Sequence, residues 1–350
     1  KIAGLVQRLQ DGESIVISEG YAWELERRGY LAAGGFVPEV VLDHPEVVRA
    51  LHEEYVHAGS DVVQAFTVRH CEITTYFAHR TKLRSVDREK DLENLNRTAL
   101  RIARDVANKT GTLMAGGVCN TGVYDPDDPK SIEMEQVEWA VEEGADYIIG
   151  ETFNDYGEGL LALQAIQKHG KGLPAVITLS PFIPDVTTDD IPMAEACRKL
   201  EEAGAAVVGL NCSRGPETML PLLKEIRKVC KGPIAALPVT FRCREDCKTF
   251  RSFKDPYSDP DKRVKSWNRS IFMSNPKDIR KFAEEAKAIG VQYIGLCCGN
   301  YSSFLREVAE VYGRKPPASK FSPNEAIHVL FGDNVNNRAK KILQYSAGTV

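Results

Sequence analysis

The sequence lacks the features that mark several large classes of protein. Its 350 residues contain no apolar run near the length of about 20 residues that spans a bilayer. Its net charge of -4 leaves no basic surplus of the kind that nucleic-acid-binding proteins carry. The amphipathic stretch Ile2–Leu9 is not followed by an apolar core and a small-residue cleavage site, so we expect no secretory signal. We therefore expect a cytoplasmic protein with no membrane or nucleic-acid partner.

Cysteine is present in an odd number, nine, which a closed set of disulfides cannot use completely. A chain of this size with 43% hydrophobic residues can bury a large core and needs no disulfide staples. Reduced thiols in an enzyme are the better interpretation. Cys243 and Cys247 form a C-x-x-x-C pair, for which a second metal pair, a disulfide and two separate loop thiols all stay open. Cys197 and Cys230 lie on expected helices, where packing is their expected role.

Short β-branched runs alternate with helical stretches along the chain, which is typical of repeated βα units and a parallel sheet. Each run is almost continuously apolar, as expected of strands that are buried on both faces. Eight runs are expected to be strands: Ser14–Gly20, Asp61–Thr67, Thr112–Val118, Asp146–Phe153, Ala175–Ser180, Ala205–Cys212, Pro233–Val239 and Val291–Cys298. Helical periodicity fills the intervals, as in Pro45–His57 and Pro276–Ile289. Eight strands with intervening helices predict a (β/α)8 TIM barrel.

The alternative fold is a doubly wound open sheet. No G-x-G-x-x-G follows the first expected strand, so the dinucleotide-binding version of that sheet has no support. We expect residues 1–315 to form the catalytic barrel and residues 316–350 to form a C-terminal tail with a helix at Asn334–Tyr345. The long polar segment Thr240–Asn275 follows the seventh strand, and loops of this length are usually functional lids or disordered.

Three cysteines end two of the expected strands, at the side of a barrel where active sites are found. Cys212 ends the sixth strand, and Cys297 and Cys298 end the eighth. Neighbouring residues of a regular strand point to opposite faces, so both thiols of the pair can face one ion only if the chain bends there, which Gly299 allows. Three thiolates with an open fourth position indicate a reactive zinc site. The alternative is that these cysteines are buried packing residues. Three cysteines that converge at one mouth of the barrel favour the metal site over this alternative.

A zinc hydrolase or lyase on the same barrel is a competing class of enzyme. Such enzymes usually bind zinc with histidine and carboxylate ligands and keep a water in the open position. None of the seven histidines falls at the end of an expected strand, which disfavours this class.

Two motifs around the cysteines, G-L-N-C at Gly209–Cys212 and G-L-C-C-G at Gly295–Gly299, resemble the zinc motifs of the homocysteine S-methyltransferases. Further segments are similar to the betaine–homocysteine S-methyltransferase branch: Glu24–Tyr30, His44–His52, Gln64–Thr67, Ala115–Val118, Gly150–Phe153 and Gly290–Gly295. The resemblance covers nearly all of residues 14–315 in the expected order. It implies one zinc ion per chain, held by Cys212, Cys297 and Cys298. It also implies methyl transfer from an onium donor to the zinc-bound thiolate of homocysteine, giving methionine.

The same resemblance implies how homocysteine is held. Glu151 matches the glutamate that binds its amino group, and Glu19 stands where the family usually has an aspartate. Gly20 follows, as in the family, and permits close backbone approach. A non-catalytic relative that only binds zinc or a ligand is the remaining alternative. The carboxylates of Glu19 and Glu151 disfavour this alternative, because a protein that only stores metal would not need them.

The donor side departs from the family, whose betaine enzymes surround a quaternary ammonium with aromatic side chains. This chain has Phe36 where they carry tryptophan, Thr152 where tyrosine follows the glutamate, and Arg69 where an aromatic run is usual. Arg69 could pair with a donor carboxylate. The donor therefore stays open between betaine, a sulfonium such as S-methylmethionine or dimethylsulfoniopropionate, and another methylated amine. Longer members of the family carry a C-terminal dimerisation arm, so the tail could support a homo-oligomer.

Overall fold

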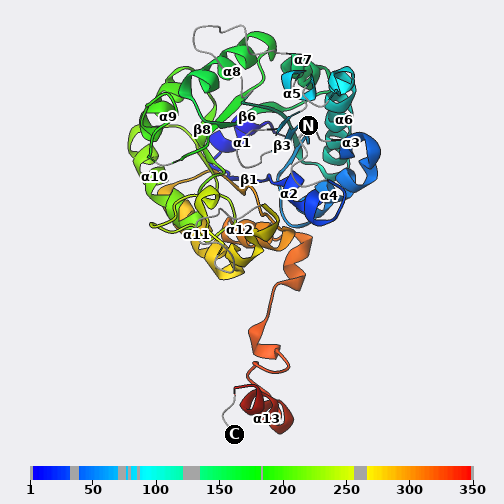
Figure 1. The fold of residues 1–350 in the computed structure, drawn as a ribbon, viewed down its shortest axis with the longest axis vertical. Coiled ribbons are helices and arrows are strands. Elements are labelled where there is room, and N and C mark those ends of the chain that lie inside the picture. Colours follow the sequence, from blue (N-terminus) through cyan, green and yellow to red (C-terminus); the bar gives the residue numbers. More distant parts are fainter. Residues whose placement is uncertain are drawn as a thin grey trace.

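The body of the protein is a ring of parallel strands with helices outside it (Figure 1). The computed structural model describes residues 3–31, 39–69, 76–77, 80–84, 87–120, 135–182, 184–255 and 266–347. Eight strands form one sheet in the order β1-β10-β9-β8-β7-β6-β5-β2. The strands are β1 (Ile15–Ser18), β2 (Val62–Gln64), β5 (Leu113–Cys119), β6 (Tyr147–Phe153), β7 (Ala175–Leu179), β8 (Val207–Asn211), β9 (Ile234–Leu237) and β10 (Tyr293–Leu296). The ring nearly closes between β1 and β2, where the amide of Asp61 donates to the carbonyl of Val16 at 2.7 Å. The predicted (β/α)8 barrel and its eight strands are confirmed.

The helices that follow these strands lie on the outer face of the ring (Figure 1). They are α2 (Tyr21–Arg27), α4 (Pro45–His57), α6 (Leu92–Thr110), α7 (Glu135–Glu142), α8 (Tyr156–His169), α9 (Met193–Glu202), α10 (Pro216–Val229), α11 (Pro276–Ile289) and α12 (Ser302–Val311). The predicted bounds of α4 and α11 are confirmed. Helix α11 begins at a capping box between Asn275 and Asp278 and ends at Gly290, whose φ of 90° is left-handed. Cys230 lies one residue beyond α10 and is buried, so it is a packing residue just outside the helix.

Smaller elements flank the repeated units. They are α1 (Leu5–Gln10), α3 (Val40–Asp43), the antiparallel pair β3 (Val68–Arg69) and β4 (Tyr76–Phe77), α5 (Arg80–Arg84), and the 3-10 turns η1 (Glu89–Asp91), η3 (Phe250–Ser252) and η4 (Ser266–Phe272). The last two lie in the insertion between β9 and α11. The described parts of that insertion therefore carry local structure of their own.

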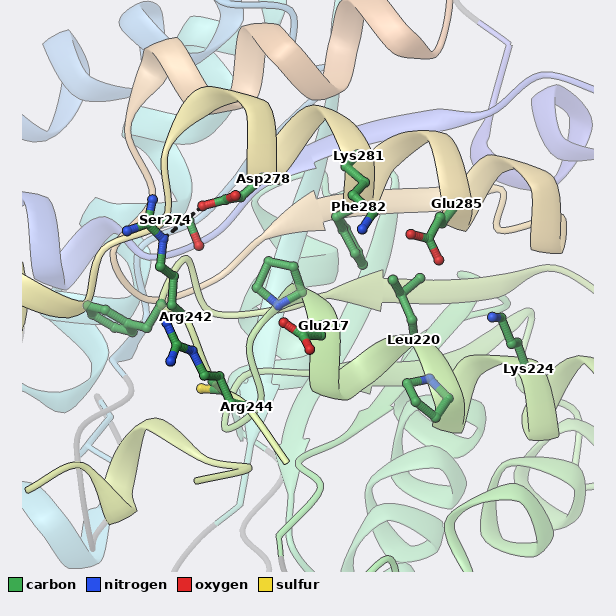
Figure 2. Close-up of a pocket in the computed structure, with 14 residues that line it drawn as sticks. Glu217, Leu220, Lys224, Arg242, Arg244, Ser274, Asp278, Lys281, Phe282 and Glu285 are labelled. Carbon is green, nitrogen blue, oxygen red and sulfur yellow. Dashed lines mark hydrogen bonds and ion pairs between the residues drawn. The ribbon is translucent and has the colours of Figure 1, made fainter. Parts of the chain in front are cut away.

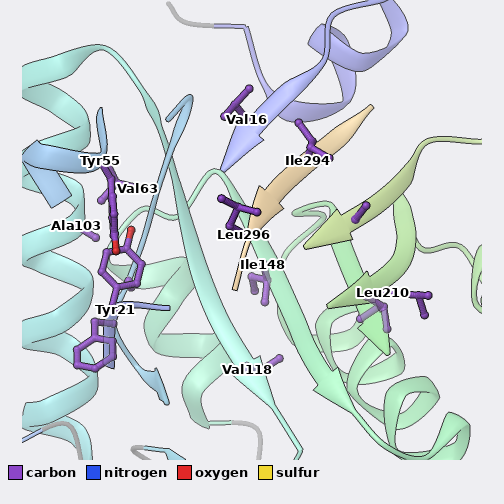
Figure 3. Close-up of a cluster of buried hydrophobic side chains, with 14 of the residues drawn as sticks. Val16, Tyr21, Tyr55, Val63, Ala103, Val118, Ile148, Leu210, Ile294 and Leu296 are labelled. Carbon is purple, nitrogen blue, oxygen red and sulfur yellow. The ribbon is translucent and has the colours of Figure 1, made fainter. Parts of the chain in front are cut away.

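Each strand is buried on both faces, which explains why the strands read as continuous apolar runs. In β1, Ile15 and Ile17 point into the barrel, while Val16 joins the apolar layer between the strands and the helices (Figure 3). Leu5 and Leu9 of α1 belong to the inner cluster and pack against the first residues of the strands. This arrangement fills the amino-terminal end of the barrel and leaves the carboxyl ends of the strands for a site.

The chain beyond residue 315 leaves the barrel as an extended arm that ends in α13 (Figure 1). The arm contains η5 (Pro317–Phe321), η6 (Glu325–Ile327) and α13 (Asn337–Ser346), which confirms a helix in the predicted tail. Several large apolar side chains of the arm are at least 60% exposed: Phe321, Ile327, Val329, Phe331 and Tyr345. Within the described ranges, no helix of the barrel or the arm is both long and apolar enough to cross a membrane.

Candidate functional site

The three predicted cysteines meet at the carboxyl ends of β8 and β10, which β9 separates in the sheet. The Sγ atom of Cys298 lies 3.7 Å from Sγ of Cys212 and 4.0 Å from Sγ of Cys297. All three sulfur atoms lie within 4.8 Å of one another, and all three side chains are buried. The cluster combines residues that are far apart in sequence because the ring brings the strand ends together.

Unusual backbone conformations aim the thiols at one point. Cys212 and Ser213 have φ values of 59° and 57°, in the left-handed region that residues other than glycine rarely adopt. Strand β10 ends at Leu296, so Cys297 and Cys298 lie in the turn that follows and not in the strand. Gly299 in that turn has a φ of 82°, and a Cβ atom there would lie 2.4 Å from Oγ1 of Thr240. The predicted bend at the cysteine pair is confirmed.

The three thiols do not share one pKa. Burial acts to raise the pKa of Cys212, but hydrogen bonds from Cys297 and Cys298 and the positive charge of Arg251 lower it well below its usual range. Hydrogen bonding to Cys212 and Cys298 raises the pKa of the Cys297 thiol well above its usual range. Cys212 therefore deprotonates more readily than Cys297.

Two buried carboxylates lie beside the cysteines, Glu19 directly after β1 and Glu151 in β6. The side-chain amide of Asn211 donates to both, at 3.3 Å to Oε2 of Glu19 and 3.2 Å to Oε2 of Glu151. Nε2 of Gln64 donates to Oε1 of Glu151 at 2.5 Å. The two carboxylates share one small pocket with two of the three cysteines, and its lining is Glu19, Gly20, Tyr21, Ala22, Trp23, Gln64, Ala65, Phe66, Glu151, Cys297 and Cys298.

The pocket has a deficit of positive charge and of hydrogen-bond donors. Burial raises the pKa of Glu19 well above its usual range, and the neighbouring charge of Glu151 raises it further. Burial raises the pKa of Glu151 to about 7, with the hydrogen bond from Gln64 acting in the opposite direction. Oε1 of Glu19 and Oε1 of Gln64 are buried and accept no N–H or O–H hydrogen bond from the described residues. Because buried acceptors without donors are costly, the pocket suits a ligand that brings an ammonium group.

The other residues singled out from the sequence divide into three groups. Gly20 has a φ of 83°, and a Cβ atom there would lie 2.5 Å from the carbonyl oxygen of Cys297, so the close approach there requires glycine. Thr152 is buried with a φ of 63°, and its amide donates to Oδ1 of Asn211 at 2.9 Å. Phe36 lies outside the described residues. Of Arg69 only the backbone, in β3, is described.

Asn211, Gln64 and Asn300 are site residues that the sequence interpretation did not identify. Nδ2 of Asn300 donates to Oγ of Ser18 at 2.7 Å and so ties the cysteine turn to the end of β1. Asn211 and Gln64 are polar residues at the carboxyl ends of apolar strands. That position is a signal that could have identified both of them.

The insertion after β9 packs against the cysteines instead of standing apart from them. Phe241, Phe250 and Phe253 are buried in one apolar cluster that also contains the three thiols. The rings of Phe241 and Phe250 stack with centroids 5.7 Å apart. These aromatic residues separate the cysteine cluster from solvent on the insertion side.

The remaining cysteines whose side chains the structure describes are not part of the three-sulfur cluster. Cys197, Cys230, Cys243 and Cys247 are free thiols, which favours two separate loop thiols for the C-x-x-x-C pair over a disulfide. In the part of the chain that the structure describes, Cys212, Cys297 and Cys298 form the only group of three or more side chains close enough to hold one metal ion.

A larger cavity lies between α10 and α11 on the outside of the barrel (Figure 2). Its volume is about 380 Å³, and charged side chains of both signs surround it, among them Glu217, Lys224, Arg242, Lys281 and Glu285. It contains none of the three clustered cysteines. The smaller pocket at the strand ends is therefore the candidate active site.

The sequence model of the family described as homocysteine S-methyltransferase matches residues 15–312. The chain is therefore a methyltransferase of the homocysteine S-methyltransferase family. It is 33% identical to the S-methylmethionine–homocysteine S-methyltransferase BHMT2 of Pongo abelii, over 91% of this chain and 84% of the relative. It is 31% identical to betaine–homocysteine S-methyltransferase 1 of Mus musculus, over 91% of this chain and 77% of the relative.

A solved structure supports the fold independently. The metallated form of the homocysteine methyltransferase MmuM from Escherichia coli superimposes with a TM-score of 0.65 at 18% identity. The match covers 87% of this chain and 99% of that protein. At this identity the likeness establishes the shared barrel and nothing finer.

Proposed function

We propose that the protein transfers a methyl group from a betaine-like onium donor to the sulfur of homocysteine, giving methionine, with one zinc ion per chain. The observation that carries the proposal is the set of three buried sulfur atoms within 4.8 Å of one another, next to two buried carboxylates. Tetrahedral Zn–S bonds of about 2.3 Å require sulfur atoms roughly 3.8 Å apart. The distances of 3.7 and 4.0 Å from Cys298 to its two partners fit this requirement.

Cys212, Cys297 and Cys298 would hold the ion and leave its fourth position for the substrate. A bound zinc ion supplies a positive centre that keeps the acceptor sulfur deprotonated at neutral pH. Glu19 and Glu151 would accept hydrogen bonds from the ammonium group of homocysteine, whose charge relieves the repulsion between the two carboxylates. These contacts orient the acceptor sulfur toward the donor methyl group, and that orientation is a large part of such a reaction's rate.

The donor is proposed to be an onium compound, with betaine as the first candidate and a sulfonium or another methylated amine as alternatives. Trp23 and Phe66 line the pocket beside the thiols, and aromatic faces attract methylated cations. The names of the two relatives indicate that one uses S-methylmethionine and the other betaine. The family alone therefore leaves the donor open.

A donor panel tests the proposed reaction. We expect the zinc-loaded protein to form methionine from homocysteine with at least one of glycine betaine, S-methylmethionine and dimethylsulfoniopropionate. The preferred donor should exceed the others at least about tenfold in kcat/KM, which corresponds to about 1.4 kcal/mol of selectivity. With glycine betaine or dimethylsulfoniopropionate, mass spectrometry should detect methionine and the demethylated donor in equal amounts. With S-methylmethionine, whose demethylated form is methionine, it should detect two methionines for each homocysteine consumed. If the protein binds zinc but forms no methionine with any of the donors, the proposed methyl transfer is wrong, and the alternative of a non-catalytic zinc-binding relative is favoured.

We also propose that the C-terminal arm, residues 316–350, mediates self-association of the barrels. The support for this is the row of exposed apolar side chains on the described part of the arm, which leaves the barrel (Figure 1). Ile327→Asp combined with Val329→Asp should convert the assembly to monomers at micromolar concentration, as measured by light scattering after size-exclusion chromatography. Asn334→Asp, an exposed polar position on the same arm, is the control. A monomeric wild-type protein would contradict the proposal.

A further inference from the structure

The insertion between β9 and α11 makes a polar contact with the residue that follows Cys212. Nη1 of Arg251, in η3, donates to Oγ of Ser213 at 2.9 Å. The same Ser213 hydroxyl lies 2.6 Å from Oγ of Ser180, the residue directly after β7. The backbone amide of Phe250 donates to the carbonyl oxygen of Ser213 at 3.0 Å. The insertion therefore holds Ser213 through its side chain and through its backbone.

Ser213 is a residue for which such support matters. It and Cys212 both have left-handed φ values, and residues other than glycine keep this conformation only when surrounding contacts impose it. Relaxation of the turn toward an ordinary conformation would turn the Cys212 side chain away from Cys297 and Cys298. The contacts to Ser213 therefore support the turn that brings the Cys212 thiol beside Cys297 and Cys298.

Arg251 is itself held in place. Its guanidinium lies over the ring of Phe182, 4.6 Å from the ring centroid, and 5.5 Å from the centroid of Phe250. A planar guanidinium held against aromatic rings loses little further freedom when it donates a hydrogen bond. Arg251 therefore presents Nη1 to Ser213 from a fixed position.

We propose that Arg251 is a positioning residue for the metal site, which acts through Ser213 to hold the turn that presents the Cys212 thiol. This assigns a role to the insertion after β9, as a clamp on one of the three sulfur ligands. The inference rests on the proposed metal-dependent function. Residues that orient metal ligands without touching the metal typically contribute a factor of about 10 to 100 in metal affinity.

A double-mutant cycle on metal affinity tests the role of Arg251. Zinc affinity is measured by chelator competition on the full-length protein with Arg251→Met, with Ser213→Ala and with both changes. Each single change should weaken zinc binding about 10- to 100-fold. The zinc affinity of the double variant should be no lower than that of the single variant that binds zinc more weakly, because both changes remove the same contact. The cobalt-substituted protein should show altered thiolate-to-cobalt absorption in all three variants. Arg244→Met, an exposed arginine of the same insertion, should leave both readouts at wild-type values.

The outcomes separate this inference from the proposed function. A wild-type protein that binds no zinc contradicts the proposed function itself. If the wild-type protein binds one zinc and Arg251→Met has the same zinc affinity and cobalt spectrum, only the role of Arg251 is overturned. The role is also overturned if the losses of zinc affinity in the two single variants add fully in the double variant. If Arg251→Met does not fold, Ser213→Ala decides the question, because it removes the acceptor with a small change of volume, and unchanged zinc affinity would overturn the clamp.

Discussion

Replacement of Cys298 with alanine is expected to abolish zinc binding and to lower methyl transfer by at least about a thousandfold, or roughly 4 kcal/mol of transition-state stabilisation. Cys298 is the central member of the cluster, with its sulfur 3.7 Å from that of Cys212 and 4.0 Å from that of Cys297. Its loss leaves two thiols, too few to hold the ion with one open position for the substrate. Zinc content per chain, from elemental analysis, and methionine formation in the same preparation measure the two effects.

The matched control for this change is Cys247→Ala. Cys247 is also a free thiol close in space to the aromatic residues of the insertion, but its sulfur is not part of the cluster. The control should keep one zinc per chain and wild-type activity. Retention of zinc and full activity by Cys298→Ala would show that the sulfur cluster is not the metal site.

Glu151→Gln is expected to raise the KM for homocysteine about 100-fold, equivalent to roughly 2.7 kcal/mol of binding free energy, while zinc stays bound. The substitution keeps the size of the side chain but removes the charge that would pair with the substrate ammonium in a buried site. It also places an amide N–H beside the ammonium group of homocysteine, which needs a hydrogen-bond acceptor at that position. Steady-state kinetics with varied homocysteine at saturating donor, together with zinc analysis, separate binding from metal loss.

The effect should fall on KM much more than on kcat, because the proposed role of Glu151 is to hold the amino group and not the reacting sulfur. Glu138→Gln changes an exposed carboxylate on α7 that pairs with His169 at the surface and serves as the control. An unchanged KM in Glu151→Gln would reject the assigned role. Loss of zinc in the same variant would instead make Glu151 a structural support of the cysteine cluster.

The predictable part of the fold follows from burial. Strands that are covered on both faces must be apolar throughout, so the eight strands could be identified as short continuous runs without knowledge of their neighbours. The ends of α11 could be identified because local groups, the Asn275–Asp278 capping box and Gly290, determine where that helix begins and ends. The three cysteines could be grouped because all strands of a barrel end at the same mouth.

Two features depended on the tertiary structure. Asn211 bridges Glu19, which follows β1, and Glu151 in β6, and only the register of the ring brings these three side chains within hydrogen-bonding distance. The insertion after β9 has a polar sequence without periodicity, from which a lid or a disordered loop was expected. Its described parts pack phenylalanines against the thiols and place Arg251 on Ser213, contacts that the sequence did not predict.

The sequence by itself predicted the barrel and the convergence of the three cysteines, because both depend on strand pattern and on position at a strand end, whereas the two carboxylates were selected through the resemblance to the family. The tertiary structure decided how those groups are held. The left-handed backbone at Thr152, Cys212 and Ser213 has no local signal, since none of these residues prefers that conformation. Such a conformation persists only where contacts from distant segments outweigh its intrinsic cost, and those contacts exist only in the folded chain.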